Sequence, residues 1–189
     1  MTEKEKQQAG ELYNAADREL TAERVAARKL CAEFNATTYN DYQKKERILD
    51  RILALRGENT KIEGNLFCDY GYNIVTGSDF KACGNIVIND CADVVFGDNV
   101  FIGADCGFYT SCRPIDAEQR NSGLEYSKAV KIGNNVWIDS GVKVMPGVTI
   151  GDNTVICGGS VVCEDIPSGV IAAGNPCKVI RPITENDKM

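Results

Sequence analysis

The sequence contains no histidine, and this absence limits the chemistry open to it. Histidine is the side chain whose ordinary pKa lies near neutrality, so proton transfer at pH 7 would need another group with a shifted pKa. Nine cysteines supply thiols, but their number is odd and no CxxC pair occurs among them. We therefore expect neither a disulfide scaffold nor a metal site.

A six-residue period organises the chain from Phe96 to Pro167. Position one of each hexad is always Ile, Val or Phe, and position five is always small or β-branched. The hexads begin at Phe96, Ile102, Phe108, Ile132, Ile138, Val144, Ile150 and Ile156. This repeat is typical of a parallel β-helix, in which short strands turn corners and stack coil on coil. Position one would fill the shaft, and position five the narrower gap beside it.

Two segments depart from the repeat. The hexads are blurred from Lys61 to Asp90 and their phase shifts before Phe96, which predicts an irregular coil or bulge around residues 91–94. The repeat also stops from 113 to 130, for about one coil, and resumes in phase at Ile132. This predicts an excursion loop, and loops that interrupt a solenoid at one place are commonly part of its working surface.

Residues 1–57 follow a helical pattern instead. Thr21 can cap a helix with one apolar stripe, formed by Ala22, Ala26, Leu30 and Phe34. A second amphipathic helix carries Ile48, Ile52 and Leu55 on one face and ends at Gly57. Neither helix has a core of its own, so we expect both to protect the open end of the β-helix.

The predicted fold is therefore dominated by β-structure. Its parts are a helical cap (1–57), a β-helix (58–170) with an excursion loop (113–130), and a C-terminal tail (171–189). The net charge of −6 argues against a nucleic-acid surface, which would need a basic stripe. No window resembles a signal peptide or a membrane span, so we expect a cytoplasmic protein without a membrane partner.

The sequence resembles the maltose and galactoside O-acetyltransferase family over essentially its whole length. The motifs that carry the resemblance keep the family's order: Gly10-Glu-Leu-Tyr13 with Asp17, Asp69-Tyr-Gly-Tyr-Asn73, Asn121-Ser-Gly-Leu-Glu-Tyr126, Ile132-Gly-Asn-Asn-Val-Trp-Ile138, Pro146-Gly-Val-Thr-Ile-Gly-Asp-Asn153 and Ala172-Ala-Gly-Asn-Pro-Cys-Lys-Val-Ile-Arg181. The resemblance implies a left-handed β-helix and a homotrimer with three sites at the subunit interfaces. It also implies that acetyl-CoA lies along the shaft and that a histidine removes the proton from a sugar hydroxyl.

The same resemblance assigns candidate site residues. Arg113 stands at the family's histidine position, with Asn85 and Asp90 as further catalytic candidates. The candidates for the sugar acceptor are Asp17, Tyr70 and Tyr72. For acetyl-CoA they are Ser140 and Gly158 along the pantetheine path, with Lys178 and Arg181 as tail cations.

The departures from the family concern chemistry. Arg113 offers only hydrogen-bond donors and stays protonated, so it cannot accept a proton from a hydroxyl. Cys83 replaces a family asparagine, and Glu164 replaces a lysine that helps to bind CoA. The corner residues of the repeat, in contrast, are intact.

Several alternatives remain open at this level. Arg113 is either an ordinary surface side chain or an anion clamp, and Cys112 is a thiolate nucleophile or, as we favour, core filler. Asp17 and the two tyrosines either hold a sugar or only cap and pack helices. The chain as a whole is either an O-acetyltransferase whose base is water or Asp90, or a non-catalytic trimer that binds a small molecule or serves as a scaffold.

Overall fold

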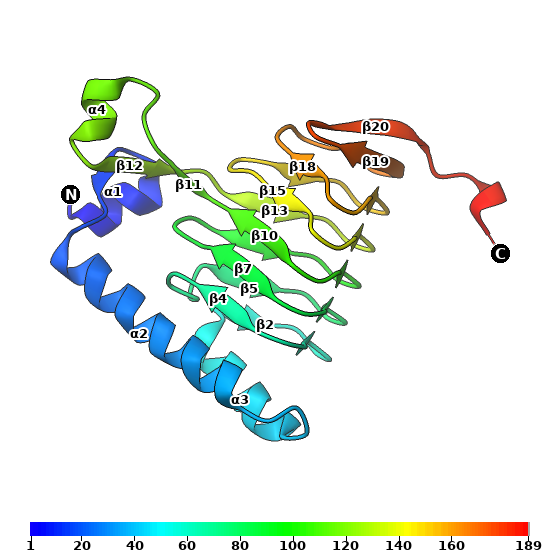
Figure 1. Cartoon of the computed structure of the whole chain (residues 1–189), viewed down its shortest axis with the longest axis horizontal. Coiled ribbons are helices and arrows are strands. Elements are labelled where there is room, and N and C mark those ends of the chain that lie inside the picture. Colours follow the sequence, from blue (N-terminus) through cyan, green and yellow to red (C-terminus); the bar gives the residue numbers. More distant parts are fainter. Residues whose placement is uncertain (189) are drawn as a thin grey trace.

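Residues 1–188 of this computed structural model form a three-sided β-helix with a helical cap at one end (Figure 1). The first sheet comprises β2 (Leu55–Arg56), β5 (Ile74–Thr76), β8 (Val94–Phe96), β13 (Val130–Ile132) and β16 (Thr149–Ile150). The second comprises β3 (Lys61–Ile62), β6 (Lys81–Ala82), β9 (Phe101–Ile102), β14 (Trp137–Ile138), β17 (Val155–Ile156) and β19 (Val170–Gly174), closed by antiparallel β20 (Cys177–Pro182). The third comprises β4 (Leu66–Cys68), β7 (Ile86–Asn89), β10 (Cys106–Tyr109), β15 (Lys143–Val144) and β18 (Val161–Val162). The predicted fold class is confirmed.

The hexad pattern explains the shaft. Side chains at position one are buried, Val144 and Ile156 completely so, and they form one continuous core that runs the length of the prism. The corners between the first and second sheets place Asn or Asp in the left-handed backbone region, at Asn59, Asp79, Asn99, Asn135 and Asn153, with φ between 54° and 57°. These short polar residues tolerate that conformation better than branched residues do.

The blurred hexads come from longer coils. Paired positions in the second sheet are 20 residues apart at Lys61, Lys81 and Phe101, but only 18 apart at Trp137 and Val155. The extra residues lie in two enlarged corners between the third and first sheets, at 69–73 and 90–93. The irregularity predicted near Cys91 is confirmed, and one coil earlier a second enlarged corner occurs that the sequence did not predict.

The excursion loop leaves the shaft at this same edge. After β10 the chain forms β11 (Ser111–Cys112), α4 (Ala117–Asn121) and β12 (Leu124–Ser127) before it re-enters the first sheet. Strand β12 pairs with β11 on one side and with β1 (Tyr13–Asn14) of the cap on the other. Phe101 and Trp137, which pair across the excursion, are 36 residues apart, twice the regular coil, so the loop occupies one coil's worth of sequence as predicted.

The cap contains three helices, α1 (Glu3–Ala9), α2 (Arg18–Ala36) and α3 (Tyr42–Ile52), and the prediction missed the first. The predicted cap of α2 was wrong, and so was half of its predicted stripe. Its N-cap is Asp17 instead of Thr21, because the Asp17 carboxylate accepts hydrogen bonds from two free backbone N–H groups of the first turn. Its buried face consists of Leu20, Ala27, Cys31 and Phe34, and Leu30 packs against the same core, whereas Ala22 and Ala26 are exposed. A strict spacing of four residues advances by about 40° per step around a helix with 3.6 residues per turn, so the predicted stripe drifts off the buried face.

The second predicted helix ends earlier than expected. Helix α3 ends at Ile52, and Leu55 lies in β2 with its side chain exposed, so the β-helix begins inside the segment predicted as cap. Residues Ile48, Leu49 and Ile52 join the core of the shaft, so α3 covers its open end as predicted. At the opposite end, the first residues of the predicted tail belong to β19 and β20, and a short 3-10 helix (Glu185–Asp187) follows (Figure 1). None of the helices described in residues 1–188 has the length and apolar character needed to cross a membrane.

Candidate functional site

The enlarged corners are held by one buried carboxylate. Asp90 is fully buried, and its two oxygens accept three backbone hydrogen bonds, from Asp69 N and Tyr70 N at 2.9 Å and from Gly71 N at 2.6 Å. Burial raises the pKa of Asp90 to about 6, although the three N–H groups act in the opposite direction. With both oxygens engaged and no exposed surface, Asp90 supports the corner and does not face a hydroxyl that it could deprotonate.

The two candidate acceptor tyrosines lie on the same corner and face the cap. Tyr70 is buried, and its hydroxyl contacts Gln7 Nε2 at 3.1 Å and Arg24 Nη1 at 2.6 Å. Tyr72 is partly exposed and donates to Glu23 Oε2 at 2.6 Å. The ring centroids of the two tyrosines are 5.5 Å apart. The structure thus gives Tyr70 a packing role, and of the two rings only that of Tyr72 is accessible to a ligand.

Asp17 lies at the start of α2, close to this corner. Its Oδ1 accepts from Glu19 N at 2.9 Å and Leu20 N at 3.3 Å, so one oxygen is used as a helix cap. Leu20, one turn later, packs in a small buried cluster with Tyr70. Asp17 therefore caps α2 and at the same time lies near the two tyrosines.

Arg113 follows β11 and has an internal partner. Its Nη2 is 2.7 Å from Glu125 Oε1 on β12. The Arg113 side chain is 59% exposed and that of Glu125 only 15%. Both residues belong to the excursion loop, and Glu125 is the strand partner of Tyr13 of β1, so the ion pair lies within the loop where it borders the cap. The position of Arg113 is predictable from sequence, but its partner was missed, although Glu125 belongs to one of the motifs already singled out.

Cys112 does not behave as an activated nucleophile. Its side chain is half-buried, and burial raises its pKa, which disfavours the thiolate. Arg113 makes its ion pair with Glu125 instead. The core-filler interpretation fits better, although Cys112 is less buried than Cys106, which occupies the equivalent hexad position one coil segment earlier.

Asn85, Ser140 and Gly158 lie on a different edge of the prism, between the second and third sheets. Asn85 donates to Asp105 Oδ1 at 3.0 Å, and the Ser140 hydroxyl accepts from Ala104 N at 3.2 Å. Gly158 is next to Ser140 on the following coil, where an added Cβ would lie 3.1 Å from the Ser140 carbonyl oxygen. Because Gly158 has no side chain, nothing projects from this part of the edge that would block a ligand lying along it.

Both tail cations have carboxylate partners. Lys178 Nζ is 2.6 Å from Glu164 Oε2, and both side chains are mostly exposed. Arg181 binds Asp187 through two nitrogens, at 2.8 Å and 2.6 Å, and this contact lowers the pKa of Asp187. An exposed pair with a single contact, such as Lys178–Glu164, is weakly held, whereas the two-point contact of Arg181 with Asp187 is firmer.

The predicted residues thus form two groups within one chain, with the two tail cations apart from both. Tyr72 and Arg113 lie along the edge between the third and first sheets, with Asp17 in the cap beside it, and Asp90 and Tyr70 support the corner from inside. Asn85 does not lie with them: β7 separates it from Asp90, because Asn85 precedes this strand and Asp90 follows it. Asn85 shares its edge with Ser140 and Gly158 instead, while Lys178 and Arg181 belong to the terminal hairpin.

Comparison with known proteins agrees with this architecture. Residues 6–56 match the model of the maltose acetyltransferase hexapeptide capping motif, and residues 129–164 match that of the bacterial transferase hexapeptide (six repeats). The galactoside O-acetyltransferase of Escherichia coli (strain K12) is 41% identical over 97% of this chain and 91% of its own length.

Solved structures give the same result. A maltose O-acetyltransferase from Clostridium difficile 630 is 48% identical, covers 98% of this chain and 99% of its own, and superposes with a TM-score of 0.96. A galactoside acetyltransferase in complex with coenzyme A is 41% identical, covers 100% of this chain and 94% of its own, and also has a TM-score of 0.96. The chain therefore belongs to the maltose and galactoside O-acetyltransferase family.

Proposed function

We propose that this protein is an acetyl-CoA-dependent sugar O-acetyltransferase that acts as a homotrimer and is slowed by Arg113 at the position of the general base. The observation that carries the proposal is full-length similarity to galactoside and maltose O-acetyltransferases, one of them solved with coenzyme A. The intact corner residues and excursion loop support it further, because they are the parts that build the site in such a fold.

The separation of the two groups of residues favours a site between subunits. A neighbouring chain packed against this one could place the edge with Asn85, Ser140 and Gly158 opposite the edge with Arg113. Each chain would then contribute an acceptor side and a cofactor side, and three equivalent sites would follow from the symmetry of a trimer.

The cofactor side has residues suited to acetyl-CoA. Gly158 and Ser140 leave a low, polar path along one edge, and Lys178 and Arg181 could exchange their carboxylates for phosphates of the nucleotide. Acetyl-CoA would supply an acetyl group activated as a thioester. Glu164 lowers the positive potential at this end, so we expect weaker binding than in a relative with a lysine there.

The acceptor side contains polar groups for a sugar but no obvious base. Arg113 can donate hydrogen bonds to a sugar oxygen or to the oxyanion formed during acyl transfer, and its charge is balanced by Glu125. The sugar hydroxyl would form the ester as the thioester C–S bond breaks, its proton would pass to water, and CoA would leave as a thiolate that takes up a proton from water. Losing a positioned base typically costs about 10²–10⁴-fold in rate, so slow turnover is compatible with this site.

A second candidate is a non-catalytic trimer that keeps a small-molecule site. The specific observation in its favour is that the two changed positions with a charge are neutralised within the chain, Arg113 by Glu125 and Glu164 by Lys178. Such a protein would bind its ligand without turning it over.

Calorimetric titration tests the proposal before any acceptor is known. Acetyl-CoA and CoA should each bind with one site per chain.

Replacement of Gly158 by Val should weaken the binding of both ligands, because the new side chain would project into the path along the edge that holds Ser140 and Gly158. Gly123→Val is a control of the same kind, since no atom lies within 4 Å of an added Cβ there, although its φ of 81° adds local strain in the loop. Absence of heat with either ligand at millimolar concentration would contradict the proposal.

A further inference from the structure

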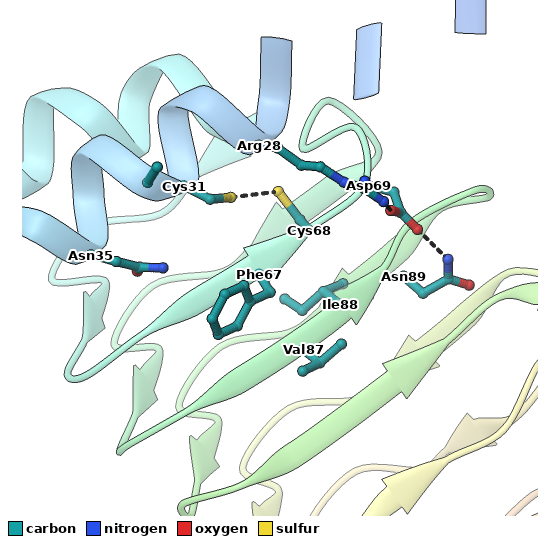
Figure 2. Close-up of a pocket in the computed structure, with 10 residues that line it drawn as sticks. Arg28, Cys31, Asn35, Phe67, Cys68, Asp69, Val87, Ile88 and Asn89 are labelled. Atoms are coloured by element: carbon teal, nitrogen blue, oxygen red, sulfur yellow. Dashed lines mark hydrogen bonds and ion pairs between the residues drawn. The ribbon is translucent and has the colours of Figure 1, made fainter. Parts of the chain in front are cut away.

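Two cysteines from distant parts of the chain meet at the junction of cap and shaft. Cys31 lies on α2 and Cys68 ends β4, and their sulfur atoms are 3.4 Å apart (Figure 2). Both thiols are free and both residues are buried. Within residues 1–188 no other two cysteine sulfurs form such a contact.

Contacts on both sides hold this thiol pair in place. One helical turn after Cys31, the Asn35 side chain exchanges two hydrogen bonds with the backbone of Leu66, at 3.0 Å and 2.9 Å. About one turn before it, Arg28 Nη2 is 3.4 Å from Asp69 Oδ1. Residues 28, 31 and 35 share one face of α2 because they are three and four positions apart. The helix is therefore fixed to β4 above and below the two thiols.

The thiols are also reachable from solvent. A pocket of about 430 Å³ opens between α2 and the third sheet, and both cysteines line it, together with Arg28, Asp69, Phe67 and Val87 (Figure 2). Phe67 and Val87 point outward from the sheet and are partly exposed. A molecule as small as a peroxide can thus reach sulfur atoms that have little surface of their own.

We propose that Cys31 and Cys68 form a redox site, in which a two-electron oxidant such as hydrogen peroxide converts the two thiols into a disulfide that ties α2 to the first coil. One of the two thiolates attacks one peroxide oxygen and becomes a sulfenic acid, with release of hydroxide. The sulfur of the other cysteine then attacks the sulfenic sulfur, and its thiol proton leaves with the sulfenic oxygen as water. Two thiols lose two electrons in total, and one peroxide is reduced to two waters once hydroxide has taken up the first thiol proton.

The geometry requires only a small movement. A disulfide bond is about 2.05 Å long, so the sulfurs must approach by somewhat more than 1 Å, within reach of side-chain rotation. Either thiol can attack first, because both cysteines line the pocket and their sulfur atoms are in contact with each other.

The link would be conditional and not a permanent staple. Disulfides in reducing compartments are usually transient and redox-sensing. The cross-link does not depend on the proposed acetyl transfer. Its position does place it next to the candidate acceptor corner, because Cys68 directly precedes Asp69 and Tyr70.

Peptide mapping tests the proposal directly on the full-length protein. The protein is treated with stoichiometric hydrogen peroxide, alkylated and cut with trypsin without reductant. Cleavage after lysine releases Cys31 in residues 30–44 and Cys68 in residues 62–81, and each peptide contains a single cysteine. We expect these two peptides to be linked and to separate after dithiothreitol. Failure to find this link, or links among other cysteines instead, would overturn the proposal.

Thermal unfolding provides the matched comparison. Closing the loop from 31 to 68 should raise the melting temperature by about 10 °C on oxidation. The rise should vanish in Cys31→Ala and in Cys68→Ala and persist in Cys163→Ala, whose thiol is exposed elsewhere. A rise that persists in Cys31→Ala would contradict the proposal.

The parent protein gives a further measurement if the buried variants fail to fold. Phenylarsine oxide bridges two neighbouring thiols, so it should protect Cys31 and Cys68 together from alkylation. Equal alkylation of both cysteines with and without the arsenical would overturn the proposal.

Discussion

Position 113 carries a permanent positive charge beside a carboxylate, where a proton acceptor would be expected. The residue type can be read from the sequence, and so can its lack of basicity. The pairing with Glu125 could not be predicted, because it depends on how β11 and β12 align within an excursion loop of irregular sequence. The same holds for Asp90. The sequence shows only an acidic residue at this position, whereas the fold shows that its carboxylate oxygens accept hydrogen bonds from three backbone N–H groups.

The role of Asp90 predicts a stability defect. In Asp90→Asn one oxygen acceptor becomes a donor that faces backbone N–H groups, so at least one buried amide loses its partner. We expect a loss of about 1–3 kcal/mol in the free energy of unfolding, measured by urea denaturation. Asp93→Asn, an exposed position in the same corner, should change stability little. Equal stability of the two variants would argue against the structural role of Asp90.

Glu164 predicts a change in cofactor affinity. Glu164→Lys removes the carboxylate that pairs with Lys178 and adds a cation, so CoA should bind about tenfold more tightly in calorimetry. Glu185→Lys makes the same charge change in an exposed tail position and serves as a control for net charge. If both variants tighten CoA binding equally, the tighter binding comes from the change in net charge, and Glu164 does not lie next to the phosphates.

At the scale of elements, the regular part of the shaft was predictable because each hexad position has a fixed environment. The first coils were not predictable, because two extra residues in each enlarged corner break the six-residue period, and the amino-acid composition of these corners does not mark them. The start of α2 was misplaced for a similar reason. Thr21 and Asp17 are both acceptable caps, and the choice between them depends on which helix face meets the shaft. Leu55 illustrates the opposite error, since the helical spacing of Ile48, Ile52 and Leu55 continued into a strand.

The continuous core predicts that one buried charge will destabilise the whole shaft. Val144 is fully buried at position one of its hexad, so Val144→Asp should cost several kcal/mol or prevent folding. Lys131→Asp, on an outward-facing position of the first sheet, should melt close to the parent temperature. Circular dichroism melts of both variants measure this. A Val144→Asp protein that melts with the parent would mean that the stack of position-one side chains does not carry stability.

At the scale of the whole molecule, a single chain does not complete the proposed site. The residues of the acceptor side and those of the cofactor side occupy different edges of the prism, and each edge is built from several coils. Sequence alone could assign residues to both sides through family resemblance. It could not reveal that Asn85 lies apart from Asp90 and Arg113, because strand direction and corner position decide that.

This separation predicts the oligomeric state. Sedimentation equilibrium should give a mass three times that of the 20.6 kDa chain, without dissociation at micromolar concentration. A protein that is monomeric yet transfers acetyl groups would show that the two edges do not need to meet.

Acetyl transfer by the parent and by Arg113→His measures whether the residue at position 113 limits the rate. The Arg113 side chain is largely exposed, so the substitution should not disturb folding, and Glu125 is placed to orient an imidazole. Acetyl-CoA consumption is measured against a panel of glucosides, galactosides and maltose, with Arg113→Gln as a variant that removes the charge without adding a base. We predict slow transfer by the parent, a rise of up to about 10²–10⁴-fold in Arg113→His, and no rise in Arg113→Gln. A parent that already turns over near the usual enzyme rate of about 10 per second, with Arg113→His no faster, would show that Arg113 does not slow this protein.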